Sequence, residues 1–258
     1  MSIFRKFLKL VLGFLARWAI KKHQIELIVV TGFYGSEIVK EGIYEIFNQK
    51  YKVRRNTDQI LWDMSLPLAV LGYKDRRRNF FEWLVLMARA TFYLLVGPKN
   101  NHTLILNANC TYDETAKFWA SFLKPDYLVI LNEEKDSAII NSLLENLKPE
   151  KSVLIYEKDK VDEAKLKKIE IDHKFTFAAK GADLNYNQSK HTISYKSEEL
   201  KIPSLLPSVI VPHIAAVFAL CVNHGFSLDE AGLEALKFDL ESILTKKIQQ
   251  NLGKEGSN

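Results

Sequence analysis

The sequence predicts an α/β protein: a doubly wound, mostly parallel sheet with helices on both faces, preceded by an amphipathic helix. From residue 103 to residue 178, short aliphatic runs alternate with stretches of helical periodicity, a pattern typical of parallel sheets. A β-branched run, a glycine loop and a helical stretch come earlier, between residues 25 and 48. At 258 residues, with 47% hydrophobic and 26% charged residues, the chain suits one principal soluble domain.

Residues 1–22 predict the amphipathic helix. Its basic side chains lie largely opposite an apolar face made of Phe4, Phe7, Leu8, Val11, Leu15 and Trp18. The uninterrupted apolar stretch is too short to span a bilayer, and no small-residue cleavage site follows it. Two interpretations stay open: the face contacts an anionic membrane surface, or it packs on the chain's own domain.

The next elements form a strand, a glycine loop and a helix. Ile25–Val30 predicts a strand that is closed by Thr31 and Gly32, and Gly35 precedes a helix from residue 36 to about residue 48. Residues 51–54 predict a second strand and residues 56–65 a loop. The strongly apolar Phe80–Val96 predicts a second exposed or half-buried helix, which we expect on the same surface as the first.

Four strands then alternate with three helices. The strands are expected at 103–108, 127–131, 152–156 and 175–178, and the helices at 113–123, 137–147 and 162–168. Residues 191–195 predict an antiparallel edge strand. Helices at 212–223 and 228–250 close the chain, the second capped by Ser227 and Glu230. The organisation is therefore a helix (1–22), a central domain (23–240) and a helix end with a frayed tail (241–258).

The charge is unevenly distributed along the chain. Residues 1–100 hold 17 Lys and Arg against 8 Asp and Glu, whereas residues 101–258 hold 19 against 23. The basic residues lie among apolar residues at helical spacing and lack the glycine and aromatic motifs of single-strand binders. We therefore expect an anionic membrane surface, and no nucleic acid, as the partner of this half.

Cysteine and histidine residues give no sign of a disulfide framework or a metal site. Cys110 and Cys221 are far apart in apolar surroundings, which predicts reduced, buried thiols and a cytoplasmic location. The six histidines have no paired metal-ligand spacing.

Four stretches, in order, carry a resemblance to a known family. They are Ile28–Gly35 before a helix, Leu66–Gly72, Leu104–Asn109 with Lys124–Asn132, and Leu206–Glu230. The chain resembles the central, ATP-binding domain of the Mur ligases, and most of all the subgroup that adds D-alanyl-D-alanine to the peptidoglycan precursor. The resemblance identifies Thr31, Gly32, Gly35, Ser36 and Glu37 as a vestigial phosphate loop.

The resemblance also marks where this chain departs from the family. The family has Lys and then Thr or Ser where this chain has Ser36 and Glu37, and a strand-end Glu where this chain has Asn107. Its Gly-x-x-His segment is replaced by residues 133–136. A unit-charge pair about 4 Å apart is worth about 4 kcal/mol in a partly shielded site, so exchanging Lys for Glu should weaken ATP binding strongly.

The resemblance therefore implies a fold that was kept and a chemistry that was lost. We expect no catalytic residue, no metal site and no cofactor, with ATP and Mg²⁺ expected if the loop still functions. The predicted role is a non-catalytic interaction or scaffold protein in peptidoglycan precursor synthesis, cytoplasmic and peripheral on the inner membrane face, with a protein partner or a second copy. The alternative is an ATP-dependent ligase component that a partner completes.

Overall fold

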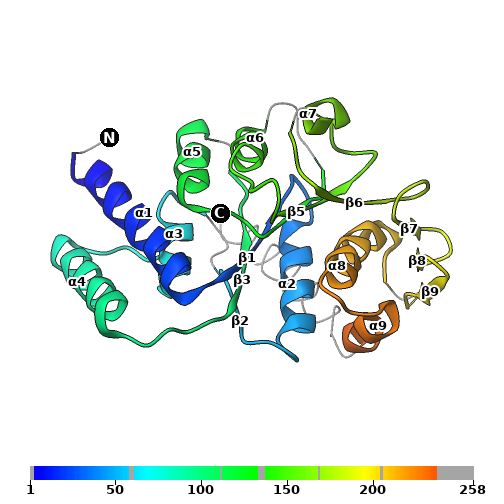
Figure 1. Ribbon diagram of the computed structural model, residues 1–258, viewed down its shortest axis with the longest axis horizontal. Coiled ribbons are helices and arrows are strands. Elements are labelled where there is room, and N and C mark those ends of the chain that lie inside the picture. Colours follow the sequence, from blue (N-terminus) through cyan, green and yellow to red (C-terminus); the bar gives the residue numbers. More distant parts are fainter. Residues whose placement is uncertain are drawn as a thin grey trace, which may run out of the picture.

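The computed structural model describes residues 3–57, 61–110, 112–132, 137–167, 169–203 and 206–236. Helices and strands alternate along most of this length (Figure 1). The helices are α1 (Ile3–His23), α2 (Ser36–Phe47), α3 (Ser65–Leu71), α4 (Phe80–Val96), α5 (Asp113–Phe122), α6 (Ala138–Leu144), α7 (Glu163–Lys167), the 3-10 helix η1 (Ser208–Ile210), α8 (Val211–Asn223) and α9 (Leu228–Leu236). The expected helix end and tail at 241–258 lie outside the described residues.

The strands form a single sheet within the described residues. They are β1 (Glu26–Thr31), β2 (Val53–Arg55), β3 (Thr103–Asn107), β4 (Tyr127–Ile130), β5 (Val153–Glu157), β6 (His173–Ala178), β7 (Leu184–Asn187), β8 (Thr192–Tyr195) and β9 (Glu198–Lys201). Their order is β2-β3-β1-β4-β5-β6-β7-β8-β9. Pairing is parallel from β2 to β7 and antiparallel between β7, β8 and β9. The predicted α/β class with a mostly parallel sheet is confirmed.

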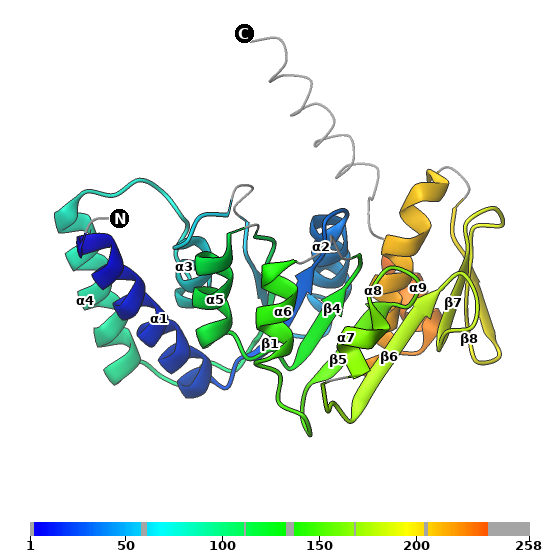
Figure 2. The same cartoon turned by 90° about the horizontal axis from the view of Figure 1, so that it is seen from above.

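Helices cover both faces of the sheet, each over its own core. Figure 2 shows α5 and α6 on one side of the sheet and α2 and α8 on the other. The first core takes apolar side chains from α1, α3, α5 and α6, with Trp119 fully buried at its centre. The second core takes them from α2, α8 and α9. Parallel strands that are covered on both faces are continuous apolar runs, as Leu27–Val30 is here.

Two differences from the sequence-based expectations concern short elements. A helix, α3, occupies Ser65–Leu71, where no regular element was expected beyond the loop at 56–65. The segment 191–195 is a strand, but β7 and β9 flank it, so β9 forms the edge of the sheet. Ser227 and Glu230 do exchange the two hydrogen bonds of the predicted cap at the start of α9.

Helix α1 is packed on the domain, so most of the side chains that were expected to contact a membrane contact the protein interior instead. Leu8 and Leu15 are buried, as are Leu12, Ala16 and Ala19 of the same helix, while Phe4, Val11 and Trp18 are half-buried against the cores. Of the six side chains expected at a membrane, Phe7 is the one that is mostly exposed. The side of α1 turned to solvent also carries large apolar side chains, Phe7, Leu10 and Phe14, between exposed Lys and Arg residues. Among the described residues, no helix is long and apolar enough to cross a bilayer.

An acidic side chain fastens α1 to the rest of the chain. Asp63, just before α3, pairs with Arg5 Nη2 at 2.9 Å and with Lys9 Nζ at 2.8 Å. Thr115 Oγ1 donates a hydrogen bond to the same carboxylate, and Trp119 Nε1 donates one to the Asp63 carbonyl oxygen. Burial opposes ionisation of this carboxyl, but the hydrogen bonds and positive charges outweigh it and lower the pKa of Asp63.

Candidate functional site

The segment between β1 and α2 has the geometry of an anion-binding loop. Thr31 ends β1 at the carboxyl edge of the sheet, and α2 begins at Ser36. Gly32 and Gly35 have φ angles of 148° and 77°, which residues other than glycine rarely adopt. A helix N-terminus directed at such a loop attracts negative charge. The predicted residues Thr31, Gly32, Gly35, Ser36 and Glu37 therefore lie together where the sequence placed them.

The backbone N–H groups of this loop bind a side chain of the protein itself. The amides of Phe33 and Tyr34 both donate to Asn132 Oδ1, at 2.6 and 3.1 Å. Asn132 follows β4, and its Nδ2 donates in return to the carbonyl oxygen of Tyr34 at 3.2 Å. Asn109 Nδ2 donates to the Gly32 carbonyl oxygen. An amide oxygen thus occupies the donors that would face an anion.

The ring of His213 covers the other end of the loop. A Cβ atom on Gly35 would lie 1.8 Å from His213 Cδ2, so glycine is required at position 35 by contact as well as by φ. Burial lowers the pKa of His213 below its ordinary value, although backbone hydrogen bonds with Val209 and Tyr34 oppose this. The ring that α8 supplies is therefore neutral at pH 7 and adds no positive charge to the loop.

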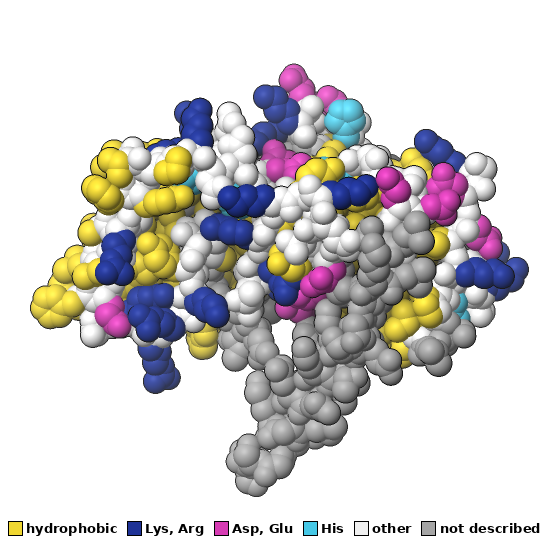
Figure 3. Space-filling view, turned by 90° about the horizontal axis from the view of Figure 1, so that it is seen from below, with side chains coloured by type: hydrophobic (Ala, Val, Ile, Leu, Met, Phe, Trp, Pro, Cys, Tyr) yellow, Lys and Arg dark blue, Asp and Glu magenta, His cyan; other side chains and the backbone are white. Residues whose placement is uncertain are grey.

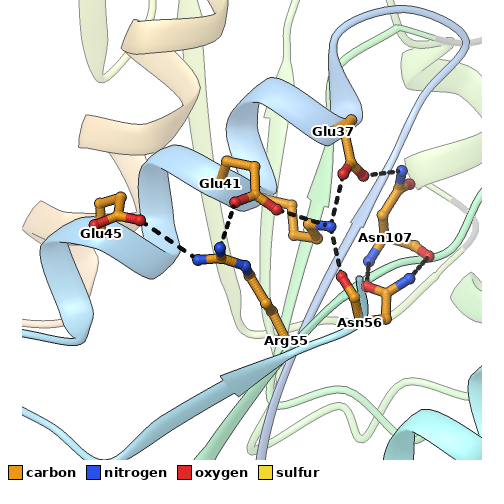
Figure 4. A network of polar contacts seen from close by, with 7 residues as sticks. Glu37, Glu41, Glu45, Arg55, Asn56 and Asn107 are labelled. Atoms are coloured by element: carbon orange, nitrogen blue, oxygen red, sulfur yellow. Dashed lines mark hydrogen bonds and ion pairs between the residues drawn. The ribbon is translucent and has the colours of Figure 1, made fainter. Parts of the chain in front are cut away.

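A network of charged side chains begins at Glu37, in the first turn of α2 (Figure 4). Glu37 Oε1 lies 2.8 Å from the Nζ of Lys40, which is fully buried. Lys40 Nζ also lies 3.0 Å from Glu41 Oε1 and donates to the carbonyl oxygen of Asn56 at 2.6 Å. The ammonium group thus has three oxygen partners, as a buried charge requires.

The second oxygen of Glu37 joins the network to β3. Asn107 Nδ2 donates to Glu37 Oε2 at 3.0 Å, and the backbone N–H of Asn107 donates to Asn56 Oδ1 at 2.9 Å. Arg55 extends the chain of charges through ion pairs with Glu41 at 3.1 Å and Glu45 at 3.5 Å. Figure 4 shows these side chains converging from α2, β2 and β3. Both oxygens of Glu37 are therefore engaged.

Thr31 Oγ1 and Asn107 Oδ1 are among the buried polar atoms near the loop that have no hydrogen-bond partner in the described residues. A cavity of about 360 Å³ lies beyond Arg55 and Asn56, and Arg54 and Lys74 also line it. Its described lining includes no carboxylate, so its charge suits anions and not metal ions.

Neither metal binding nor thiol chemistry finds support in the described part of the chain. No group of three or more His, Cys, Asp or Glu side chains there is placed to hold a metal ion. Both cysteines are free; Cys221 is buried and Cys110 half-buried. Burial raises the pKa of both thiols, so they are protonated and poorly nucleophilic at pH 7.

Sequence reasoning missed three residues of this site. Lys40 lies three residues after Glu37 and directly before Glu41, and this spacing of opposite charges was the local signal available for it. Asn132 and His213 reach the loop from segments about 100 and 180 residues away, and no local pattern announces such contacts. The expected loss at residues 133–136 lies outside the described residues.

Comparison with known proteins finds relatives by structure alone. No family model matches the sequence, and no curated protein matches it. MurF ligase of Thermotoga maritima, solved in complex with ADP, is 15% identical over 87% of this chain and 52% of its own, with a TM-score of 0.63. UDP-N-acetylmuramoylalanyl-D-glutamyl-2,6-diaminopimelate–D-alanyl-D-alanyl ligase of Acinetobacter baumannii is 14% identical over 88% and 49%, with a TM-score of 0.65.

A second group of ligases gives the same result at lower similarity. FolC of E. coli, in complex with DHPP and ADP, is 14% identical over 87% of this chain and 60% of its own, with a TM-score of 0.53. The chain spans about half the length of the MurF proteins it matches. At these identities the likeness concerns the fold. The chain has the fold of the Mur ligase central domain.

Proposed function

We propose that this chain is a non-catalytic, Mur-ligase-like protein that acts as an interaction or scaffold protein near the membrane in peptidoglycan precursor synthesis. The observation that carries the proposal is the carboxylate of Glu37 at the N-terminus of α2. It lies 2.8 Å from the buried ammonium group of Lys40 and accepts a hydrogen bond from Asn107. The positive end of the helix thus already has an anion, supplied by the chain itself.

The residues of the loop do not fit a magnesium-bound polyphosphate. Ser36 brings no positive charge to the phosphates, and Glu37 brings a negative one. The amides of Phe33 and Tyr34 already bind Asn132. Repulsion between two unit charges about 4 Å apart costs about 4 kcal/mol at a partly shielded site, which corresponds to several orders of magnitude in affinity.

Position 107, where the resemblance places a metal-binding glutamate, also does not suit Mg²⁺. Asn107 offers a neutral amide oxygen, a poorer ligand for Mg²⁺ than a carboxylate. Its amide nitrogen is turned to Glu37, where a carboxylate at the same position would be repelled. The hydrogen bond between Asn107 and Glu37 therefore supports a loop that is stabilised without nucleotide.

One alternative has a specific observation in its favour. The MurF proteins are about twice as long as this chain, and the T. maritima one was solved with ADP. A ligase component that is completed by a partner would then need a working phosphate loop. Nucleotide binding therefore separates the two functions.

Isothermal titration of the full chain with ATP in excess Mg²⁺ tests the proposal. We expect no measurable heat of binding for ATP or ADP, because the loop lacks a cation and contains a carboxylate. A dissociation constant in the micromolar range would overturn the non-catalytic function and favour the ligase component.

A matched pair of variants tests whether the two loop residues are the cause. Ser36→Lys with Glu37→Thr supplies the cation and removes the repulsion, so we expect it to gain nucleotide affinity, while Ser36→Lys alone, which keeps Glu37, gains less. Thermal unfolding confirms that both variants fold. Equal affinity in the two folded variants would contradict the role given to Glu37.

A further inference from the structure

Helices α1 and α4 form one end of the molecule and run in parallel, side by side (Figures 1 and 2). Near their N-termini the rings of Phe4 and Phe80 lie 5.1 Å apart. Near their C-termini Lys22 Nζ donates to the Leu94 carbonyl oxygen, and the rings of His23 and Tyr93 lie 5.6 Å apart. The two helices are thus held together along their length.

The outer side of this pair is apolar. On α4, the inward face of Leu86, Met87, Ala90 and Leu94 is buried. The opposite face, which also includes the exposed Arg89, carries Phe81, Leu84, Val85, Phe92, Leu95 and Val96, which are all exposed. On α1, Phe7, Leu10 and Phe14 are exposed at spacings of three and four residues, on one stripe of the helix. We call these nine side chains the α1–α4 surface.

A surface of this kind is unusual for a helix at the edge of a soluble domain. Such helices normally turn polar side chains to the solvent, and large contiguous apolar patches mark sites of interaction. Phe81 is 75% exposed and Leu10 is 74% exposed, and none of the described residues covers them. Water contact with this much apolar area favours an apolar partner.

Positive charge surrounds the same surface. The two segments that contain it, residues 3–23 and 74–99, hold 12 Lys and Arg against 2 Asp and Glu, whereas the rest of the chain holds 24 against 29. Figure 3 shows hydrophobic side chains gathered at the end of the molecule that contains α1 and α4, with Lys and Arg beside them. The chain's whole excess of positive charge is therefore carried by these two segments.

We propose that the α1–α4 surface is the part of this protein that lies on an anionic lipid bilayer. The exposed phenylalanines and leucines would enter the boundary between headgroups and acyl chains, and the surrounding Lys and Arg would meet lipid phosphates. The occupant is a bilayer and not a second copy, because two such surfaces facing each other would bring net positive charge against net positive charge.

This inference deepens the membrane-proximal part of the proposed function, and it rests on that part. It also revises the face that the sequence predicted: Leu8 and Leu15 belong to the protein interior, and α4 supplies most of the lipid-facing side chains. Nucleotide titration and vesicle binding are independent measurements. If the vesicle experiment fails, this surface is not a membrane anchor, but the argument about nucleotide binding at the loop between β1 and α2 is unaffected.

Sedimentation of the full chain with vesicles tests the proposal. The probe is a vesicle of phosphatidylcholine and phosphatidylglycerol in equal amounts, compared with one of phosphatidylcholine alone. We expect binding to the first, weaker binding to the second, and a decrease with added salt. Equal binding to both vesicles, or binding to neither, would overturn the proposal.

Matched variants locate the surface. Phe81→Ser, Phe92→Ser and Leu95→Ser together remove exposed rings and methyl groups, and we expect about tenfold weaker binding to the anionic vesicles. The control is Tyr112→Ser with Val209→Ser, which removes exposed apolar side chains elsewhere and should leave binding unchanged. Circular dichroism confirms that both fold.

Light scattering tests whether a second copy of the chain, and not a bilayer, contacts the α1–α4 surface. We expect the full chain to be monomeric in the absence of lipid, and the triple variant to be monomeric too. A dimer that the triple variant abolishes, or a triple variant that binds vesicles as well as the control does, would assign this surface to another occupant and overturn the proposal.

Discussion

The loop at the start of α2 and the outer side of α1 and α4 differ in whether their side chains find partners within the chain. At the loop, charged and polar groups are buried and satisfied from within the chain: Lys40 by two carboxylates and a carbonyl oxygen, and the loop amides by Asn132. On α1 and α4, large apolar side chains remain in contact with water.

The difference bears on where this protein meets other molecules. A network that satisfies its own charges offers little to an incoming ligand, because each new contact must first break one already made. An apolar surface in water gains free energy from any partner that covers it. We therefore expect little nucleotide binding at the loop, and we expect the partner of this chain to contact the apolar surface at the other end of the molecule.

The largest effect is expected from two leucines of α1 that test whether this helix belongs to the protein interior. Leu12 is fully buried, whereas Leu10 is 74% exposed. Leu12→Ala should lower the free energy of unfolding by about 3 kcal/mol because it leaves a cavity, and Leu10→Ala should change it by less than about 0.5 kcal/mol. Urea denaturation measures both. Equal effects of the two substitutions would mean that α1 is not docked.

A smaller effect is expected when the charge network loses its centre. Lys40→Ala leaves the carboxylates of Glu37 and Glu41 close together without their shared cation. Because these carboxylates keep some solvent contact, we expect a loss of about 2 kcal/mol in unfolding free energy, below the range for fully buried pairs.

The control for that variant is Lys50→Ala, which breaks an exposed pair with Glu230 and should cost less than about 0.5 kcal/mol. If Lys40→Ala proved as harmless as Lys50→Ala in chemical denaturation, the network would not be the closed unit described above, and the contrast between the two ends would weaken.

The smallest effect concerns Asp63, whose carboxylate ties α1 to the domain. Its pKa is lowered in the folded protein, so its ionised form contributes stability that is present above the unfolded pKa of about 3.9 and is lost as the pH falls through the lower folded value. Asp63→Asn should therefore be about 1 kcal/mol less stable than the natural protein at pH 7.

The pH dependence gives this prediction its control. The stability difference between Asp63→Asn and the natural protein should close as the pH falls from the unfolded pKa of about 3.9 through the lower folded value, because protonated Asp63 resembles asparagine. Urea midpoints measured from pH 7 down to about pH 2 follow it. A difference that stays constant over this range would show that the ion pairs with Arg5 and Lys9 contribute nothing.

Local patterns carried most of the fold. The alternation from residue 103 to residue 178 predicted β3 to β6, and Phe80–Val96 was predicted with the bounds that α4 has. The elements missed have weak local signals: β7 and β9 have four residues each, most of them polar or charged, and α3 contains a proline and spans seven residues. Strand pairing in such segments comes from neighbours in space.

The site was predictable where one segment forms it and not where several segments meet. Thr31, Gly32, Gly35, Ser36 and Glu37 are contiguous or nearly so, and a resemblance in order and spacing found them. The partners that contact the loop come from the segment after β4, which contains Asn132, and from α8, which contains His213. The orientation of α1 could not be settled from its sequence, because docking on a domain and lying on a lipid surface demand the same amphipathic pattern.

The edge strands have a consequence for how copies of this protein can associate. Unpaired backbone groups at a sheet edge are templates for strand addition, and short or charged edge strands prevent it. One edge, β2, has three residues, two of them arginines. The other, β9, reads Glu-Glu-Leu-Lys, with both glutamates turned to solvent or nearly so. Both edge strands thus disfavour edge-to-edge pairing between copies of this protein, even though its helices carry so apolar a surface.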